Sequence, residues 1–265
     1  MIVDKINRYL SQEELTFNEA IRYQIEKLAG YVFRRQFMEN NDTSTEGKLR
    51  ISSLGRCPRQ IAYTYHGFEK KGKQIDSRAK IVFWTGDLTE MTIISLAKLA
   101  GVTLTATGLE QIKVELPVSK EVTAEGHPDG LLIHQNKIYL MEIKSMTSYA
   151  FERFQWGDID QSYLVQVNCY MEALGLDACC FVALNKESGV LSERVVTKKP
   201  EIIADVRKKV SEIIASTPEN LPERPYQPDE KGFYPWQCRY CSYWGHCLPN
   251  AKEVLVGNKY KLKEV

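Results

Sequence analysis

The sequence predicts an α/β fold in which helices flank a mixed β-sheet, and three observations support this prediction. The chain has 265 residues and is 43% hydrophobic, which suits one large globular domain, alone or with an appendage. Segments with helical apolar spacing alternate along the chain with short apolar runs typical of strands. Near the middle, several strand-like runs follow one another across short turns, as antiparallel strands do.

The expected elements follow in the order helix, antiparallel strands, helix and strand. Helices are expected at residues 13–39, directly after Cys57, and at 77–100, 149–154, 161–174 and 200–216. Strands are expected at residues 102–107, 111–115, 122–124, 177–184 and 189–196. Glycines 101 and 175 end two of the helices, and residues 40–47 form a polar break.

Three regions follow from this order. Residues 1–50 form an N-terminal helical segment without a recognisable motif, and residues 51–216 form the core. Residues 217–265 form a proline-rich linker and a cysteine-rich tail, because four of the ten prolines fall within residues 217–232.

The most informative string is Gly126-His127-Pro128-Asp129-Gly130, followed by Met141-Glu142-Ile143-Lys144. The apolar run between them carries one polar turn, Gln135-Asn136, which predicts a β-hairpin with that turn at its tip. Such a hairpin brings Asp129 and Glu142 together. Glu142 and Lys144 are two residues apart, so their side chains project from the same face of the strand.

Two carboxylates beside a lysine suit metal-dependent phosphodiester hydrolysis. Carboxylate oxygens are the ligands that Mg²⁺ prefers, and a lysine can orient or deprotonate a water or stabilise charge on a phosphate. The alternative is a solvated face with weak surface ion pairs. The flanking residues Leu140, Met141 and Ile143 favour the functional interpretation, because charges rarely enter an apolar strand unpaired.

Asp129 with Glu142-Ile143-Lys144 resembles the signature of the PD-(D/E)XK nuclease superfamily. Gln166 and Tyr170 resemble the additional Gln-x-x-x-Tyr motif of its RecB-like branch, and their spacing of four puts them on one face of a helix. Taken alone, these two residues also suit an ordinary amphipathic helix. The resemblance covers roughly residues 53–247 and implies a restriction-endonuclease-like core.

The resemblance also implies a metal site and roles for its residues. RecB-like families carry Gly-x-x-x-His on an upstream helix, whereas this chain has Gly86-x-x-x-Glu90, with Asp87 as a second candidate ligand and an exposed helix residue as the alternative for Glu90. One or two Mg²⁺ or Mn²⁺ ions are expected on Glu90, Asp129, Glu142 and the carbonyl of Ile143. Lys144 would position or activate the attacking water, and Gln166 and Tyr170 would hydrogen-bond that water or the substrate backbone.

Cysteine provides a second constellation. Three of the seven cysteines form a C-x2-C-x5-C string, Cys238, Cys241 and Cys247, for which His246 or Cys57 could supply a fourth ligand. This pattern resembles AddB and the CRISPR-associated RecB-like family, which implies a [4Fe–4S] cluster on Cys57, Cys238, Cys241 and Cys247 as a C-terminal staple. A structural Zn²⁺ with four cysteines fits the same spacing. The odd cysteine count and the lack of a visible signal peptide disfavour disulfides.

These features predict a metal-dependent DNA nuclease, an exonuclease on single-stranded ends, acting in recombination or repair, phage DNA metabolism or CRISPR adaptation. With a net charge of +1, DNA affinity must come from local patches of positive charge. The chain has no helicase motif, so unwinding needs a helicase, integrase or recombination partner.

No apolar run reaches transmembrane length, so a cytoplasmic location is expected. The alternatives are a non-catalytic DNA-binding or assembly subunit and a zinc-ribbon interaction module. Endonuclease or exonuclease action and its polarity stay open.

Overall fold

The structure is a computed structural model that describes residues 1–15, 18–37, 48–72 and 76–265. Its helices are α1 (Val3–Leu10), α2 (Glu19–Phe37), α3 (Pro58–Tyr65), α4 (Ser77–Leu99), α5 (Ser148–Gln155), α6 (Gln161–Leu174), α7 (Pro200–Ala215), α8 (Trp236–Arg239) and α9 (Trp244–Cys247). Its strands are β1 (Leu49–Arg50), β2 (Thr103–Thr105), β3 (Val114–Pro117), β4 (Thr123–Gly126), β5 (Gly130–His134), β6 (Lys137–Met146), β7 (Ala178–Asn185), β8 (Leu191–Thr197), β9 (Ala251–Val256) and β10 (Lys259–Glu264).

A five-stranded mixed sheet with the order β2-β5-β6-β7-β8 forms the centre of the fold. Only β6 and β7 pair in parallel within it, and the chain joins them through α5 and α6. A smaller sheet with the order β1-β4-β3 lies beside it, and β9 and β10 form a separate two-stranded sheet. The predicted mixed α/β architecture is therefore confirmed.

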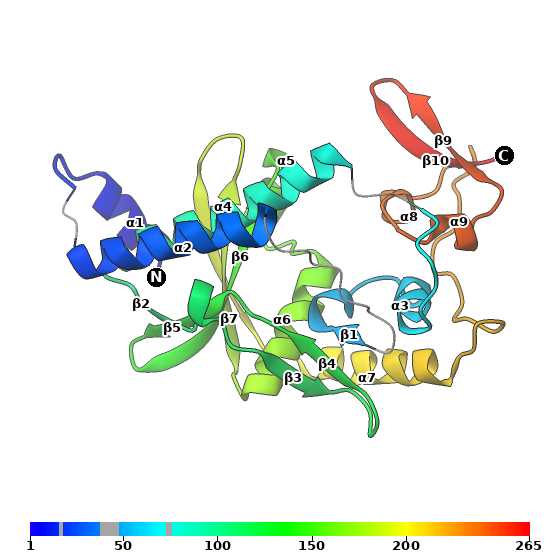
Figure 1. Cartoon of the computed structure of the whole chain (residues 1–265), viewed down its shortest axis with the longest axis horizontal. Coiled ribbons are helices and arrows are strands. Elements are labelled where there is room, and N and C mark those ends of the chain that lie inside the picture. Colours follow the sequence, from blue (N-terminus) through cyan, green and yellow to red (C-terminus); the bar gives the residue numbers. More distant parts are fainter. Residues whose placement is uncertain (16–17, 38–47, 73–75) are drawn as a thin grey trace.

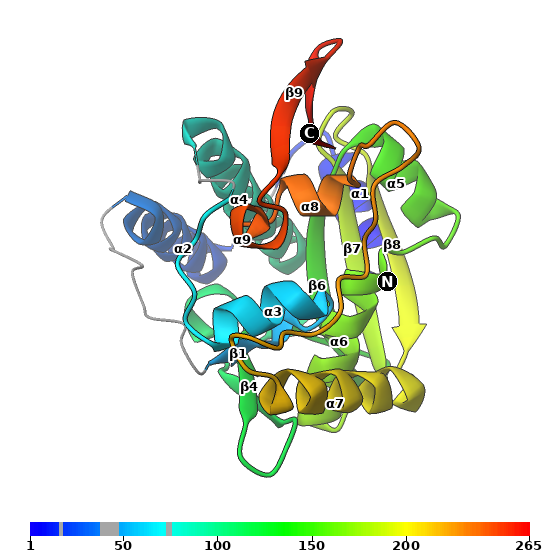
Figure 2. The same cartoon turned by 90° about the vertical axis from the view of Figure 1, so that its right-hand side faces the viewer.

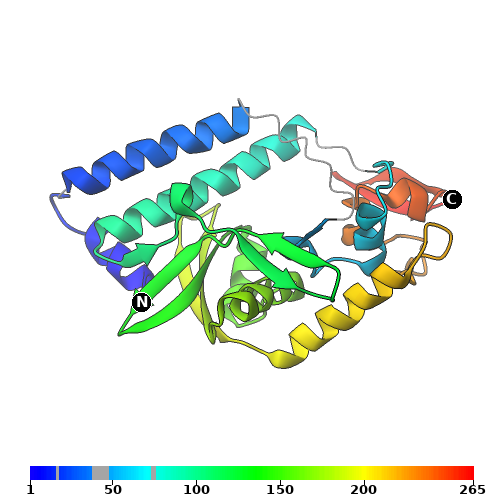
Figure 3. The same cartoon turned by 60° about the horizontal axis from the view of Figure 1, so that its bottom comes forward.

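The alternation of side chains along the central strands divides the apolar core into two clusters. On β7, Cys179 and Phe181 pack in the cluster that contains α6 and α7, whereas Cys180 and Val182 pack in the cluster that contains α1, α2 and α4. Figure 3 shows α2 and α4 side by side on one side of the sheet, with α7 on the opposite side. Figure 1 shows the same layers along the length of the molecule.

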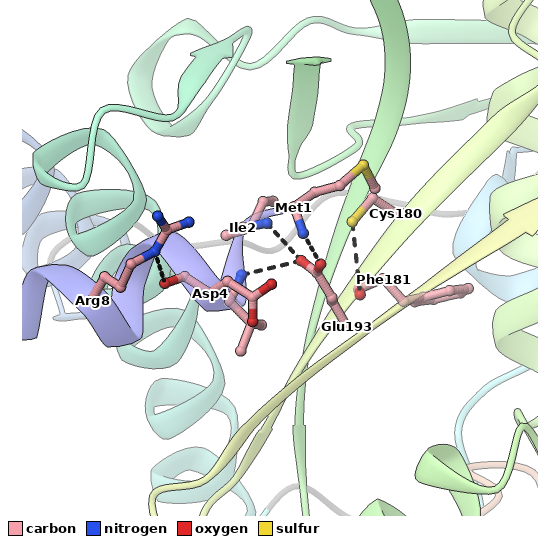
Figure 4. Close-up of polar contacts among 8 residues, drawn as sticks. Met1, Ile2, Asp4, Arg8, Cys180, Phe181 and Glu193 are labelled. Carbon is pink, nitrogen blue, oxygen red and sulfur yellow. Dashed lines mark hydrogen bonds and ion pairs between the residues drawn. The ribbon is translucent and has the colours of Figure 1, made fainter. Parts of the chain in front are cut away.

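Helix α1 is attached to the far edge of the sheet by Glu193 of β8. One oxygen of this carboxylate accepts hydrogen bonds from the main-chain N–H groups of Ile2 (2.6 Å) and Val3 (3.1 Å), and the other pairs with the amino group of Met1 (Figure 4). The carboxylate satisfies N–H groups at the start of the helix that have no partner within it.

The C-terminal segment forms a separate corner of the molecule. The short helices α8 and α9 pack beside α3, and the β9–β10 hairpin projects from them (Figure 2). Glycines allow the chain to approach closely here: a Cβ on Gly245 would lie 1.9 Å from the carbonyl oxygen of Lys71, and one on Gly72 would lie 2.5 Å from that of Cys241. No helix in the described ranges is long and apolar enough to span a membrane.

Several predicted boundaries differ from the structure. The helix expected at residues 13–39 begins only at Glu19, residues 13–15 are not helical, and residues 16–17 and 38–47 lie outside the described residues. The sequence analysis did not predict α1, β1, the short helices α8 and α9, or the β9–β10 hairpin. The strand expected at 111–115 begins at Val114, because residues 108–110 form a turn of 3-10 helix. The other helices and strands lie within a few residues of their expected positions.

Candidate active site

The predicted hairpin is present as β5 and β6. Gln135 and Asn136 form its tip with φ values of 49° and 59°, the left-handed conformation that a two-residue hairpin turn requires. The β5–β6 pairing ends at Gly130↔Met141, so β6 continues beyond its partner from residue 142 onwards. Glu142 and Lys144 stand on this free stretch of β6, while β7 supports its other edge.

Asp129 closes the end of the β5–β6 ladder. Its Oδ2 accepts a hydrogen bond of 2.7 Å from the main-chain N–H of Ile143, which β5 no longer pairs. This bond fixes the Asp129 carboxylate beside the Glu142–Lys144 stretch. Burial raises the pKa of Asp129 well above its ordinary value, and the negative charges of Glu142 and Glu90 raise it further.

Glu142 is the most deeply buried charged group of the site, with 1% of its surface exposed. Its Oε1 accepts hydrogen bonds from Lys144 Nζ (2.5 Å) and Gln166 Nε2 (2.9 Å). Its Oε2 is buried and has no hydrogen-bond partner among the described residues. A buried carboxylate oxygen without a partner is costly, and such an atom suits a metal ion as its ligand.

Lys144 supplies the positive charge beside the two carboxylates. Burial lowers the pKa of Lys144, but the negative charges of Glu142 and Asp129 outweigh burial, so the pKa lies above its ordinary value. The ammonium group also lies 4.8 Å from the ring centroid of Tyr163, a cation–π contact that the sequence reading missed. Lys144 is therefore a cation at neutral pH in the metal-free site.

Helix α6 brings Gln166 and Tyr170 to the site on one face, as their spacing predicts. Gln166 reaches Glu142, and the Tyr170 hydroxyl donates a hydrogen bond of 3.1 Å to the carbonyl oxygen of His127. A Cβ on Gly126 would lie 2.6 Å from that hydroxyl, so the first glycine of the motif makes room for Tyr170. Burial raises the pKa of Tyr170, and the charges of Glu142 and Asp129 add to the effect.

Glu90 lies on α4, which packs against β6. Its Oε1 accepts a hydrogen bond of 3.0 Å from Gln111 Nε2, a partner that the sequence reading missed. Its charge acts on Asp129, and Glu90 and Asp87 line one small pocket with residues of α2. The main chain of Ile143 lies at the site through its bond to Asp129, while its side chain is buried toward α4.

The candidate ligands do not form a finished metal site in this arrangement. Over the described residues, no three His, Cys, Asp or Glu side chains are arranged to hold a metal ion. Lys144 and Gln166 occupy one oxygen of Glu142. The donor set still fits a hard divalent cation, because it offers carboxylate oxygens and includes the unpartnered Oε2 of Glu142.

The four cysteines of the predicted cluster line one pocket, between α3 and the α8–α9 segment: Cys57, Cys238, Cys241 and Cys247. All are free thiols. The His246 side chain makes other contacts: its Nε2 lies 2.8 Å from the carbonyl oxygen of Glu69, and its ring stacks on Tyr63. The structure therefore brings Cys57, rather than His246, to the other three cysteines.

The chemistry of this pocket differs from that of the carboxylate site. Burial raises the pKa of Cys238 to about 12 and that of Cys241 to about 11, and neighbouring cysteines contribute. Both groups are therefore protonated thiols at neutral pH. The other cysteines, Cys169, Cys179 and Cys180, are buried in the apolar core.

The sequence matches the PD-(D/E)XK nuclease superfamily over residues 49–248, which is most of the chain. Its mixed α/β fold is consistent with a nuclease, and this chain belongs to the PD-(D/E)XK nuclease superfamily. No protein with a curated description matches it.

Solved structures with a similar fold include an alkaline exonuclease, LHK-Exo, from Laribacter hongkongensis. It is 16% identical with a TM-score of 0.44, and the alignment covers 64% of this chain and 88% of that chain. The complex of LHK-Exo with dAMP gives 19% identity and a TM-score of 0.46 over 64% and 87% of the two chains. A structure named SSO0001 is 17% identical with a TM-score of 0.46, covering 85% of this chain and 95% of that chain.

Proposed function

We propose that this nuclease is a Mg²⁺- or Mn²⁺-dependent DNA exonuclease that acts on single-stranded ends. The buried Oε2 of Glu142 is the observation that carries the proposal, because it has no hydrogen-bond partner among the described residues. Asp129 and Glu90 add carboxylates beside it, as the raised pKa of Asp129 indicates. Such a donor set would hold one or two divalent ions, with the carbonyl of Ile143 as a further ligand.

A bound divalent ion would supply Lewis acidity toward the phosphate and lower the pKa of a bound water. The protein's own residues have separate tasks. Asp129 and Glu142 would bind the ion at the free end of β6. Lys144 would place a positive charge where negative charge develops on the phosphate. Lys144 would orient the attacking water as a hydrogen-bond donor, since it is a cation at neutral pH.

Gln166 and Tyr170 would orient the reacting groups. Gln166 donates a hydrogen bond to Oε1 of Glu142, while Oε2 has no partner among the described residues and would be available to a metal ion. Tyr170 fixes the His127 carbonyl next to Asp129, and its raised pKa keeps it a hydrogen-bond donor. Both residues would contact the bound water or the substrate backbone once DNA is present.

The test is degradation of end-labelled single-stranded DNA with Mn²⁺ by the wild type and by Lys144→Ala. We expect loss of about two to four orders of magnitude in rate for the variant. Lys137→Ala is the matched control, because Lys137 starts the same strand but is exposed and remote from Asp129. Equal cleavage by wild type and Lys144→Ala would refute the assigned site. No cleavage by metal-loaded wild type would favour the non-catalytic binding subunit.

We also propose that Cys57, Cys238, Cys241 and Cys247 hold a structural [4Fe–4S] cluster. Their shared pocket supports this, because four cysteines are the usual ligands of such a cluster. The cluster would tie α3 to the tail and take no part in hydrolysis. Iron and sulfide analysis of the anaerobically purified protein tests it: bound iron with equivalent sulfide is expected, and a single zinc ion would refute it.

The DNA substrate implies partners that open duplexes or join ends. A helicase, integrase or recombination protein would provide the single-stranded ends, as the sequence predicts. The pathway follows from which of these proteins co-purifies with the chain.

A further inference from the structure

The β9–β10 hairpin has two chemically different faces. Its register pairs Lys259 with Val256, Lys261 with Val254 and Lys263 with Lys252, and directly paired residues share a face. One face therefore carries four lysines, which we call the lysine face: Lys252, Lys259, Lys261 and Lys263. The opposite face packs on the C-terminal core through Ala251 and Leu262.

The positive charge of the lysine face is not paired with acidic groups among the described residues. No described residue forms an ion pair with any of the four lysines. The two acidic residues of the hairpin, Glu253 and Glu264, lie on the other face, where Arg239 (2.8 Å) and the Tyr234 hydroxyl (3.2 Å) hold them. In a chain with a net charge of only +1, this face is a local concentration of cations.

An aromatic ring lies among these lysines. The ammonium groups of Lys261 and Lys263 lie 5.1 Å and 5.5 Å from the ring centroid of Phe233, which pairs with Lys263 through an isolated bridge. Phe233 is half-buried, so its ring keeps an accessible part. Cations interleaved with an aromatic ring are the composition of surfaces that follow a nucleic-acid strand.

The spacing of the lysines also suits a DNA strand. Alternate residues of a strand are about 6.8 Å apart, and Lys259, Lys261 and Lys263 alternate along β10. Phosphates of a stacked DNA strand rise about 3.4 Å each, so every second phosphate matches one lysine. The hairpin stands free of the five-stranded sheet, which leaves the lysine face open to a long ligand (Figure 2).

We propose that the lysine face binds the phosphate backbone of the DNA substrate as a second contact outside the active site. This inference rests on the proposed function for its ligand. The enzyme would then hold a long strand at two places, one on β6 and one on the hairpin. A tetranucleotide reaches only the first, so the hairpin contributes to affinity for long DNA and not to cleavage itself.

The test is the triple variant Lys259→Gln, Lys261→Gln, Lys263→Gln, assayed by fluorescence anisotropy with a long single-stranded oligonucleotide in EDTA, which prevents cleavage. We expect affinity to fall about tenfold or more, and the slope of log affinity against log salt to fall by about 2. Cleavage of a tetranucleotide with Mn²⁺ is expected to stay unchanged. The corresponding triple arginine variant should retain wild-type affinity.

The matched control replaces three exposed lysines elsewhere, Lys120, Lys137 and Lys208, with glutamine. It changes net charge equally, so an equal loss of affinity would mean that total charge matters and the lysine face does not. Unchanged affinity and salt slope in the hairpin variant would assign the lysines to keeping the free strand edges from pairing with other chains, and would overturn the proposal. Failure of wild type to cleave any DNA refutes the nuclease proposal alone, because binding is measured separately.

Discussion

Two groups of candidate ligands lie in this molecule, one on β6 and one where α3 meets the α8–α9 segment, and their surroundings differ. On β6, the protein already supplies a cation, an amide and a main-chain N–H to the carboxylates, and one oxygen of Glu142 stays unpartnered. In the cysteine pocket, burial raises the pKa of Cys238 and Cys241 and so keeps these two thiols protonated.

The comparison teaches that hydrogen bonds already order the carboxylate site, whereas the order of the cysteine pocket would depend on a bound group. Lys144, Gln166 and the main-chain N–H of Ile143 hold the carboxylates in place, although the raised pKa of Asp129 shows that their negative charge is only partly compensated. If the cysteine pocket holds the proposed cluster, its thiols lose their protons on binding, and the binding free energy stabilises the tail. Changes on β6 should therefore affect activity most, and changes at the cysteines should affect stability most.

The largest effect on stability is expected from Cys241→Ala. Loss of one thiolate would remove the bound cluster and cost several kcal/mol, since the cluster joins α3 to the tail. Thermal unfolding and iron content measure the two consequences together. Cys169→Ala is the matched control, because Cys169 is buried in α6 outside the pocket, and it should keep its iron. A Cys241→Ala protein with full iron and wild-type unfolding temperature would remove the contrast between the sites.

Asp129 should make the metal-free protein less stable as the pH rises. Its pKa is raised above the ordinary value of 3.8, so the folded state binds the proton more tightly than the unfolded state. The stability that this protonation contributes is present below pH 3.8 and is lost as the pH rises through the raised pKa. Asp129→Asn should flatten this dependence in EDTA and stabilise the protein at pH 7.

Unfolding temperature measured against pH in EDTA, with and without the substitution, checks this prediction. Excess Mg²⁺ should remove the difference in slope, because a bound cation favours the charged carboxylate. Glu187→Gln, an exposed carboxylate on the turn after β7, is a control that should leave the profile unchanged. Parallel profiles for wild type and Asp129→Asn would show that Asp129 is not held in a crowded carboxylate site.

A smaller effect is expected from Tyr163, which positions Lys144 through its ring. Tyr163→Leu removes the cation–π contact and should lower kcat about threefold to tenfold with little change in KM. Tyr163→Phe keeps the ring and should retain the wild-type rate. If both substitutions change KM equally and leave kcat unchanged, Tyr163 contacts DNA and does not position Lys144.

The sequence predicted most of the carboxylate site, because local rules determine it. A two-residue turn at Gln135-Asn136 sets the register of β5 and β6, and the register places Asp129 near Glu142. The main-chain N–H of Ile143 is free to bond to Asp129 because the β5–β6 pairing ends before it. No local sequence pattern indicates where that pairing ends. Tyr163 contacts Lys144, and Gln111 contacts Glu90. Both contacts depend on how α6 and α4 pack in the fold, so the spacing of residues along the sequence could not identify them.

The misses have similar physical causes. Helix α1 depends on Glu193, about 190 residues away in sequence, whose carboxylate satisfies its first N–H groups. The β9–β10 hairpin did have a local signal, Gly257-Asn258 between alternating residues, with Gly257 at a φ of +61°. The lysines of its strands obscured that signal, since charged residues are uncommon in strands.

The assignment of the unpartnered Glu142 oxygen to a metal ion, which distinguishes this site from the cysteine pocket, is tested most directly by Mn²⁺ binding. Isothermal titration of the metal-free protein with Mn²⁺, for the wild type and for Glu142→Gln, reports the ion without requiring turnover. We expect binding by the wild type and a loss of at least about tenfold in affinity for the variant, because the unpartnered carboxylate oxygen is replaced by an amide. Equal affinity in both proteins would contradict the assignment of that oxygen to a metal ion.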